Sequence, residues 1–427
     1  MPSRVLWRRS ATAFSVYGST ALGFLATIVA ARELSTGDFA RFALVFGATT
    51  LLQLFVDLTI DEVVVKYGNR YAATQDWGRF HRLIRIGFLI KMIGGAAGTL
   101  AVIAAAALSP WLWQTGGIVG ALLIASLIPL IQQPEGMAGA LLLLRSRYDL
   151  RGAMLFWAMA LRFVAIVIAA PHGLLPVFVG IVVAQAISTV SVVAVGWVAF
   201  RRFPRAPAKQ LGDDRPAIRS FAIQSSLASG LTSLRTSLPT VLVGVVAAGA
   251  QVGNFRIAQA PQTAFQSLSA PARLVLLAEQ TRDIEHGRPD RAFSLLRRYI
   301  VGTTLFSLVV TPPLWIFMPG ILRFVYSGKW AAAANPCRVM VLVACVQLIF
   351  AWTKTFPVSI GRPGLRLAGQ AVEIAVLVPA LLALTVVWGA TGAAIGALIS
   401  SLALAGFWIV WIGRIRRGTL SRSEAVA

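Results

Sequence analysis

Long apolar stretches follow one another along almost the whole chain of 427 residues, with only short charged connectors between them. A helix needs roughly 20 mostly apolar residues to cross a bilayer. Twelve stretches of about this length lie near 11–31, 39–60, 84–108, 117–144, 151–170, 174–200, 219–247, 253–278, 299–321, 335–358, 367–388 and 391–413. The pattern predicts an all-α, polytopic membrane protein with about twelve transmembrane helices.

The scarcity of charge supports this prediction. Charged residues make up 13% of the chain and the mean hydropathy is +0.75. A soluble domain carries about 25% charged residues. The chain therefore has too little polar surface for a water-soluble globule, and lipid is its main solvent.

The net charge of +23 comes from 39 Lys and Arg against 16 Asp and Glu. We expect no nucleic-acid partner, because the basic residues alternate between connectors in the way that marks cytoplasmic loops. They concentrate near 4–9, 66–85, 145–151, 201–219, 282–298, 362–366 and 414–417, whereas the connectors 109–116, 171–173 and 389–390 have none. This asymmetry predicts a multi-pass protein of the cytoplasmic (inner) membrane with both termini in the cytoplasm.

The connector 201–218 is rich in proline and charge and lies near the midpoint of the chain. About six apolar stretches precede it and six follow it. We expect it to be the hinge between two six-helix lobes, 1–205 and 206–427, arranged around a central cavity. Such internal duplication is common in transporters.

Six basic residues fall inside or at the edge of predicted membrane helices, where each would cost roughly 2.5–3.5 kcal/mol if it faced lipid at the bilayer centre. They are Lys91, Arg162, Arg235, Arg256, Arg273 and Lys354. Snorkelling to the interface suits Lys91 and also fits Arg256 and Arg273. Arg162 and Arg235 lie deeper, which favours a functional role.

A polar stripe runs along the stretch 253–278. Gln259, Gln262 and Gln266 share one helical face with Arg256 and Arg273, because they recur at steps of three and four residues. Shorter stripes on 39–60 and 219–247 accompany it. The stripes indicate either a shared hydrated cavity or hydrogen bonding between helices.

Three acidic residues, Asp57, Glu135 and Glu373, are candidates for coupling transport to an ion, since an intramembrane carboxylate is costly unless used or paired. Neutralisation of a nearby base is the alternative role, favoured for Glu373. No phosphate-binding loop, HExxH, GxSxG or metal-spaced histidine cluster occurs, so we expect no catalytic residue, metal or cofactor.

Four segments resemble the polysaccharide (Wzx-like) branch of the multidrug/oligosaccharidyl-lipid/polysaccharide flippase superfamily. They are ARELSTGDFARF at 31–42, VGNFRIA at 252–258, VYSGKW at 325–330 and GATGAAIG at 389–396. In the last of them, Gly392 and Gly396 also form a GxxxG packing face.

The resemblance implies a twelve-helix, two-lobe fold that moves a polyprenyl-pyrophosphate-linked glycan across the membrane by alternating access, with lipids and other polysaccharide assembly proteins as partners. A cationic lumen, a family tendency, would suit Arg162, Arg235 and Arg273, with Lys354 less central, and Gln259, Gln262 and Gln266 would contact sugar hydroxyls. Two alternatives stay open. One is a multidrug exporter of the same superfamily, and the other is a membrane glycan ligase, polymerase or acyltransferase.

Overall fold

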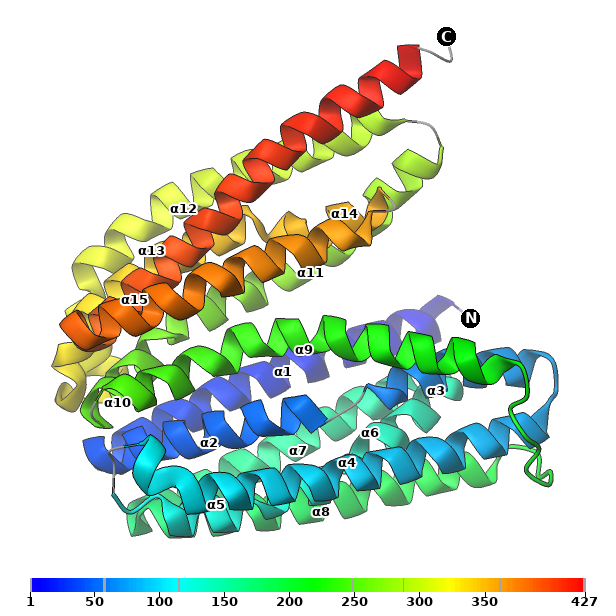
Figure 1. Ribbon diagram of the computed structural model, residues 1–427, viewed down its shortest axis with the longest axis horizontal. Coiled ribbons are helices and arrows are strands. Elements are labelled where there is room, and N and C mark those ends of the chain that lie inside the picture. Colours follow the sequence, from blue (N-terminus) through cyan, green and yellow to red (C-terminus); the bar gives the residue numbers. More distant parts are fainter. Residues whose placement is uncertain are drawn as a thin grey trace. The chain divides into compact units, whose positions relative to one another are not determined.

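The computed structural model describes residues 2–56, 59–113, 116–247, 249–286, 288–360 and 362–424, and all regular elements in these ranges are helices. The chain forms two compact units, Met1–Val241 and Leu242–Ala427. Figure 1 shows the succession of long helices in each unit. The prediction of an all-α polytopic membrane protein is confirmed.

The first unit is built from long helices packed side by side. Its elements are α1 (Pro2–Glu33), α2 (Thr36–Val56), α3 (Ile60–Ala73), α4 (Trp77–Leu112), α5 (Val119–Ala125), α6 (Leu127–Leu144), α7 (Tyr148–Ala169), the short 3-10 helix η1 (Ala170–His172), α8 (Leu174–Arg201) and most of α9 (Asp214–Val246).

The second unit continues with shorter and interrupted helices. Its elements are α10 (Gly249–Ala258), α11 (Ala260–Glu285), α12 (Pro289–Tyr326), η2 (Gly328–Ala333), α13 (Ala334–Ile349), η3 (Ala351–Lys354), α14 (Phe356–Ser359) and α15 (Pro363–Glu424).

Each predicted apolar stretch corresponds to one helix or to a helix interrupted within the stretch. The stretch 117–144 divides into α5 and α6 at Ser126, and 253–278 divides into α10 and α11 near Gln259. Two predicted stretches lie within α15, where Gly389 adopts a φ of 56° and the chain folds back (Figure 1). A Cβ on Gly396 would lie 2.8 Å from the backbone of Leu381, which confirms the predicted glycine packing face.

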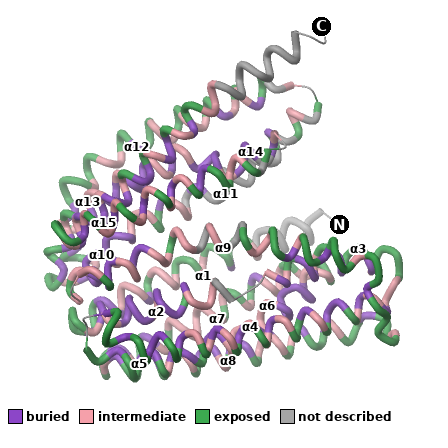
Figure 2. Tube along the Cα trace, viewed as in Figure 1, coloured by how far each residue is buried: buried purple, intermediate pink, exposed green. Residues whose placement is uncertain are grey.

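The outer faces of the long helices are apolar. Along α8 the buried and exposed positions alternate in a helical rhythm (Figure 2), and its exposed side carries Val179, Val183, Ile187 and Val190. Large exposed apolar side chains on a helix of 28 residues are what lipid contact requires. These faces identify the surface that hydrocarbon covers.

Eight helical segments are long and apolar enough to cross a membrane, counted over the described residues, and Gly364–Gly413 accounts for two of the predicted stretches. The predicted stretches of α2, α9 and α10–α11 are not among these eight segments of the described residues, and α9 contributes the shorter apolar segment Leu234–Val246.

The connector 201–218 packs against the first unit along part of its length. Phe203, Leu211 and Ile218 are buried in the same apolar cluster as Phe80, and the Lys209 N–H donates to the Gly78 carbonyl at 3.1 Å. Apolar side chains among its prolines and charges anchor the connector to the first unit.

The two compact units meet at Val241–Leu242, so most of α9 lies in the first unit. The hydrogen bonds of α9 show why: Ser226 bonds with Thr59 at 3.0 Å, and Asp214 accepts from Tyr71 at 3.0 Å. The division into lobes 1–205 and 206–427 stays a prediction.

The basic connectors of the first unit gather at one end of it. His81 lies 2.9 Å from the Pro204 carbonyl, and Arg145 donates to the Arg202 carbonyl. Arg41, near the start of α2, does not belong to these connectors and lies beside Gly117 in the connector between α4 and α5. This segregation is the arrangement that the alternating charge predicts, while the cytoplasmic orientation stays a prediction.

Candidate functional site

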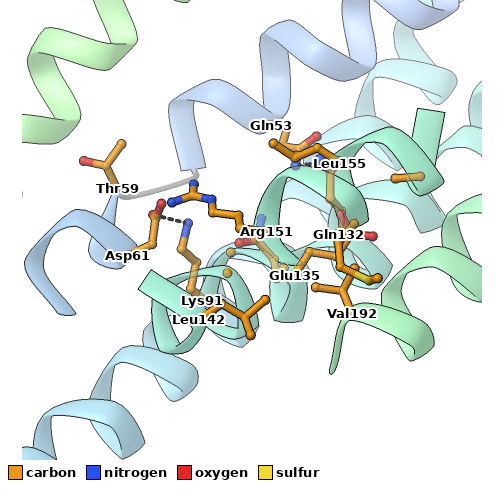
Figure 3. A pocket seen from close by; sticks show the side chains of 15 residues that line it. Gln53, Thr59, Asp61, Lys91, Gln132, Glu135, Leu142, Arg151, Leu155 and Val192 are labelled. Atoms are coloured by element: carbon orange, nitrogen blue, oxygen red, sulfur yellow. Dashed lines mark hydrogen bonds and ion pairs between the residues drawn. The ribbon is translucent and has the colours of Figure 1, made fainter. Parts of the chain in front are cut away.

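Two adjoining cavities lie inside the first unit. The larger has a volume of about 280 Å³ and the smaller about 200 Å³. Gln53 of α2 and Gln132 of α6 line both, and their side chains are 3.4 Å apart (Figure 3). The two cavities therefore adjoin at this pair of amides.

One face of α6 builds much of the larger cavity. Gln132, Glu135, Gly136 and Gly139 line it, and they recur at steps of three, one and three residues, so they share one side of the helix. Helix α6 continues through Pro134 without a break. The two glycines leave a notch in this face because they have no side chain.

Glu135 is held by three donors from α8. Its Oε1 accepts hydrogen bonds from Gln185 at 2.8 Å, from Ser188 at 2.8 Å and from Thr189 at 2.9 Å. These donors lie at steps of three and one along α8, which places them on the side that faces α6. Together the three hydrogen bonds fix the carboxylate of Glu135 against α8.

Arg162 joins the same network from α7. Its Nη2 donates to Gln185 Oε1 at 2.8 Å, and its guanidinium lies 5.8 Å from the ring of Phe46. Arg162 also lines the smaller cavity. Two predicted site residues, Glu135 and Arg162, are thus connected through Gln185, a residue that the sequence analysis did not single out.

Lys91 and Asp61 form an ion pair at the other side of the larger cavity (Figure 3). Lys91 Nζ lies 3.2 Å from Asp61 Oδ1, and the lysine side chain is only 5% exposed. Lys91 does not snorkel to the interface, although its place near a helix end favoured that interpretation. An opposite charge lies close enough to pair with it inside the unit.

Arg151 extends from the first turn of α7 into the larger cavity, toward the Asp61–Lys91 pair (Figure 3). Its Nε lies 3.6 Å from the position that a Cβ on Gly139 would occupy. Sequence analysis counted Arg151 among the connector bases, because it lies at the boundary of a predicted helix. Arg151 shares a helical face with Met154, Leu155 and Ala158, which also line the cavity. This spacing is the sequence feature that could have identified Arg151 as a cavity residue.

Three bases and two acids line the two cavities, counted over the described residues. They are Lys91, Arg151, Arg162, Asp61 and Glu135. Each acid already has donors or a cation beside it. The remaining binding capacity of these cavities is therefore for anions and for groups that accept hydrogen bonds.

The predicted glutamine stripe lies in the second unit and forms contacts between helices. Gln262 and Gln266 of α11 donate to Gln347 Oε1 of α13 at 2.9 and 3.0 Å, and Gln347 donates to Ser401 of α15 at 3.1 Å. Arg256 donates to Gln259 at 3.1 Å. Gln347 was missed, since a single glutamine in an apolar stretch has no periodic partner.

The other predicted site residues are spread over both units. Arg235 on α9 and Lys354 in η3 are half-buried, and Glu373 on α15 is buried. Asp57 lies outside the described residues, as does the side chain of Arg273. Among the described residues, no group of three His, Cys, Asp or Glu side chains could hold a metal.

A sequence profile described as "Polysaccharide biosynthesis protein" matches residues 6–277, which is more than half of the chain. The chain belongs to the polysaccharide biosynthesis protein family. This membership confirms the resemblance that the four sequence segments indicated. No curated protein matches the chain in sequence.

Solved structures confirm the fold of this family member. An inward-facing multidrug resistance MATE family transporter of the MOP superfamily is 14% identical, with a TM-score of 0.76, covering 94% of this chain and 96% of its own. The lipid II flippase MurJ in an inward closed conformation is 12% identical, with a TM-score of 0.74, and the match covers 94% of this chain and 87% of the MurJ chain.

A third similar structure is a MOP superfamily transporter from Pyrococcus furiosus, described as having a binding pocket of reverse polarity. It is 13% identical, with a TM-score of 0.62, and the match covers 97% of both chains. At these identities the similarity establishes the fold. The polysaccharide biosynthesis family member is thus a multi-pass membrane protein whose fold is similar to that of MATE transporters and MurJ.

Proposed function

We propose that this protein is a transporter, not an enzyme, and that it flips a polyprenyl-pyrophosphate-linked oligosaccharide across the cytoplasmic membrane by alternating access. The family membership supports the part of this proposal that concerns polysaccharide biosynthesis. The observation that carries the rest is the polar interior of the first unit. There Arg162 lines a cavity and has N–H donors beyond the one that it gives to Gln185.

The donors of Arg162 are the first reason for this proposal. A guanidinium has five N–H donors, and Arg162 uses one of its nitrogens for Gln185. Its planar fork matches phosphate oxygens with two parallel hydrogen bonds. Arg162 is therefore suited to hold a phosphoryl group while the neighbouring amides of Gln53 and Gln132 accept and donate to sugar hydroxyls.

The energetics of the substrate explain why such an interior is needed. Moving a sugar hydroxyl or a diphosphate out of water without hydrogen-bond partners costs a desolvation free energy of several kcal/mol or more. Fixed donors and cations replace part of that lost hydration. Arg235, Arg273 and Lys354 complete the cationic path in this proposal, and several partial contacts permit release more readily than one deep site does.

A multidrug exporter is the competing proposal, because MATE transporters share the fold. An exporter of cationic drugs needs carboxylates that are free to pair with its substrate. Here Glu135 accepts from three donors and Asp61 pairs with Lys91. This engagement of both acids favours an anionic substrate over a cationic one.

The test is a flipping assay with purified protein in proteoliposomes that contain a fluorescent prenyl-diphosphate-linked oligosaccharide. Arg162→Ala is expected to lower the initial flipping rate by roughly tenfold or more, because a charged hydrogen bond contributes about 1.5–3 kcal/mol. Arg162→Lys should restore part of the rate, since it keeps the charge and loses the fork.

Arg82→Ala is the matched control, because Arg82 is an exposed base on α4 of the same unit. Equal rates for wild type, Arg162→Ala and the control would reject the role of Arg162. Export of a cationic dye without any flipping of the glycan lipid would favour the exporter instead, and a change in the covalent structure of the glycan lipid would favour an enzyme.

A further inference from the structure

Arg151 is the starting point for a further binding site in the larger cavity. Its guanidinium lines the cavity and is half-buried. In the part of the chain that the structure describes, no residue forms an ion pair or a side-chain hydrogen bond with it. Desolvating a cation is costly unless an anion or a hydrogen-bond acceptor lies beside it, so this guanidinium favours a ligand that brings negative charge into the cavity.

Lys91 provides a second cation close by. A Cβ on Gly136 would lie 3.6 Å from Lys91 Nζ, and a Cβ on Gly139 would lie 3.6 Å from Arg151 Nε. Positions three apart on a helix are about 5–6 Å apart. The two cations therefore lie over adjacent positions of one face of α6, where the absence of glycine side chains lets both of them approach the helix beside the cavity.

Asp61 occupies this site as an internal anion. Its carboxylate pairs with Lys91, and its side chain is 27% exposed, whereas that of Lys91 is 5% exposed. Asp61 can therefore turn toward solvent more easily than Lys91 can. The remaining charged group of this cavity, Glu135, is directed to α8 and accepts from three donors there.

The polar lining supports a phosphorylated ligand. The amides of Gln53, Gln132 and Gln133 accompany the two cations, and amide N–H groups donate to phosphate oxygens. A volume of about 280 Å³ exceeds the space of several waters at roughly 30 Å³ each. It therefore admits a diphosphate with part of its hydration.

We propose that Arg151 and Lys91 form a diphosphate-binding subsite over the Gly136–Gly139 notch of α6, in which Asp61 is the resident anion that the ligand displaces. The inference rests on the proposed function, because a diphosphate is the charged part of the proposed substrate. It adds a subsite distinct from Arg162, on the opposite side of the Gln53–Gln132 pair. Binding breaks the Lys91–Asp61 pair and involves no covalent change.

The test measures binding of farnesyl diphosphate and inorganic pyrophosphate to the purified full-length protein in lipid nanodiscs by calorimetry. Arg151→Gln is expected to raise the dissociation constant of farnesyl diphosphate by on the order of tenfold, as for loss of a charged hydrogen bond. Lys91→Met should weaken binding similarly. Arg82→Gln, which removes an exposed charge from α4, should leave binding within twofold.

Asp61→Asn gives the opposite expectation. It removes the competing carboxylate and should strengthen diphosphate binding, whereas a purely structural pair would give unchanged or weaker binding and contradict the displacement of Asp61. Equal affinity of farnesol and farnesyl diphosphate would contradict a diphosphate site. Comparable binding of inorganic pyrophosphate would assign recognition to the phosphates alone, and binding of only the farnesyl compound would assign it to a lipid headgroup.

Arg151→Gln keeps the test decisive where Lys91→Met fails to fold, because none of the described residues forms an ion pair with Arg151 that this change would break. Unchanged affinity of Arg151→Gln would overturn the subsite. The flipping assay distinguishes the two proposals: normal flipping with unchanged binding in this variant rejects the subsite alone, whereas absence of glycan-lipid flipping by the wild-type protein rejects the proposed function.

Discussion

At the scale of single residues, the interior of the first unit is organised by hydrogen bonds between helices rather than by isolated charges. Glu135 on α6, Gln185 on α8 and Arg162 on α7 form a continuous network. Removing one member would leave buried partners unsatisfied, which costs about 1–3 kcal/mol for each group. The network therefore positions Arg162 as well as Glu135.

Glu135 provides a test of ion coupling. In Glu135→Gln the side chain keeps an acceptor oxygen for the α8 donors but loses its charge, so we expect a folded protein with slower flipping and a weaker response to an imposed ion gradient. Ser188→Ala is the control, because it removes one donor and leaves the charge. Unchanged rate and gradient dependence would exclude Glu135 from coupling, and Asp57→Asn would then be tested in the same assay.

At the scale of elements, close helix contacts depend on residues without a side chain at the point of contact. Gly196 of α8 packs on Ala138 of α6, where an added Cβ would lie 2.6 Å from the Ala138 Cβ and 2.9 Å from its Cα. Because the second of these atoms is backbone, the neighbour cannot rotate away. This contact holds α8 in the position from which its donors reach Glu135.

Gly196→Ala is accordingly expected to destabilise the protein by about 1–3 kcal/mol, as overpacking of a filled core does. Thermal unfolding in detergent, followed by loss of monodisperse protein, should show a lower midpoint. Gly302→Ala on α12 is the matched control, since a Cβ there would meet nothing within 4 Å. An equal unfolding midpoint for both variants would contradict the tight contact between α6 and α8 at Gly196.

At the scale of the whole molecule, charge and packing both divide the chain, and they divide it differently. Basic residues concentrate in every second connector between the apolar stretches, and the basic connectors of the first unit gather at one end of it. The contacts place the boundary between compact units within α9, after Val241. Helix α9 contains Pro239 two residues before that boundary.

Membrane topology is the property to measure at this scale. Truncated fusions to a reporter after residues 75, 148, 210, 286 and 364 are expected to read as cytoplasmic, and fusions near 113 and 328 as external, because Lys and Arg concentrate in cytoplasmic loops. An exposed cysteine introduced at Trp111, labelled from outside intact cells, supplies an independent readout. Cytoplasmic readouts at both external positions would overturn the orientation.

The sequence alone determined the fold class, the helix positions and the polar character of α2, α9 and α10–α11, because hydropathy over about twenty residues is a local property of the chain. It also singled out Glu135 and Arg162 as candidate site residues. It could not show that Gln185 joins them, that Lys91 meets Asp61, or that Arg151 faces the cavity, since each depends on how separate helices pack and rotate. The connector 201–218 has the composition of a linker, yet burial of Phe203 and Leu211 anchors it. Tertiary contacts alone decided which polar residues pair and where the two units divide.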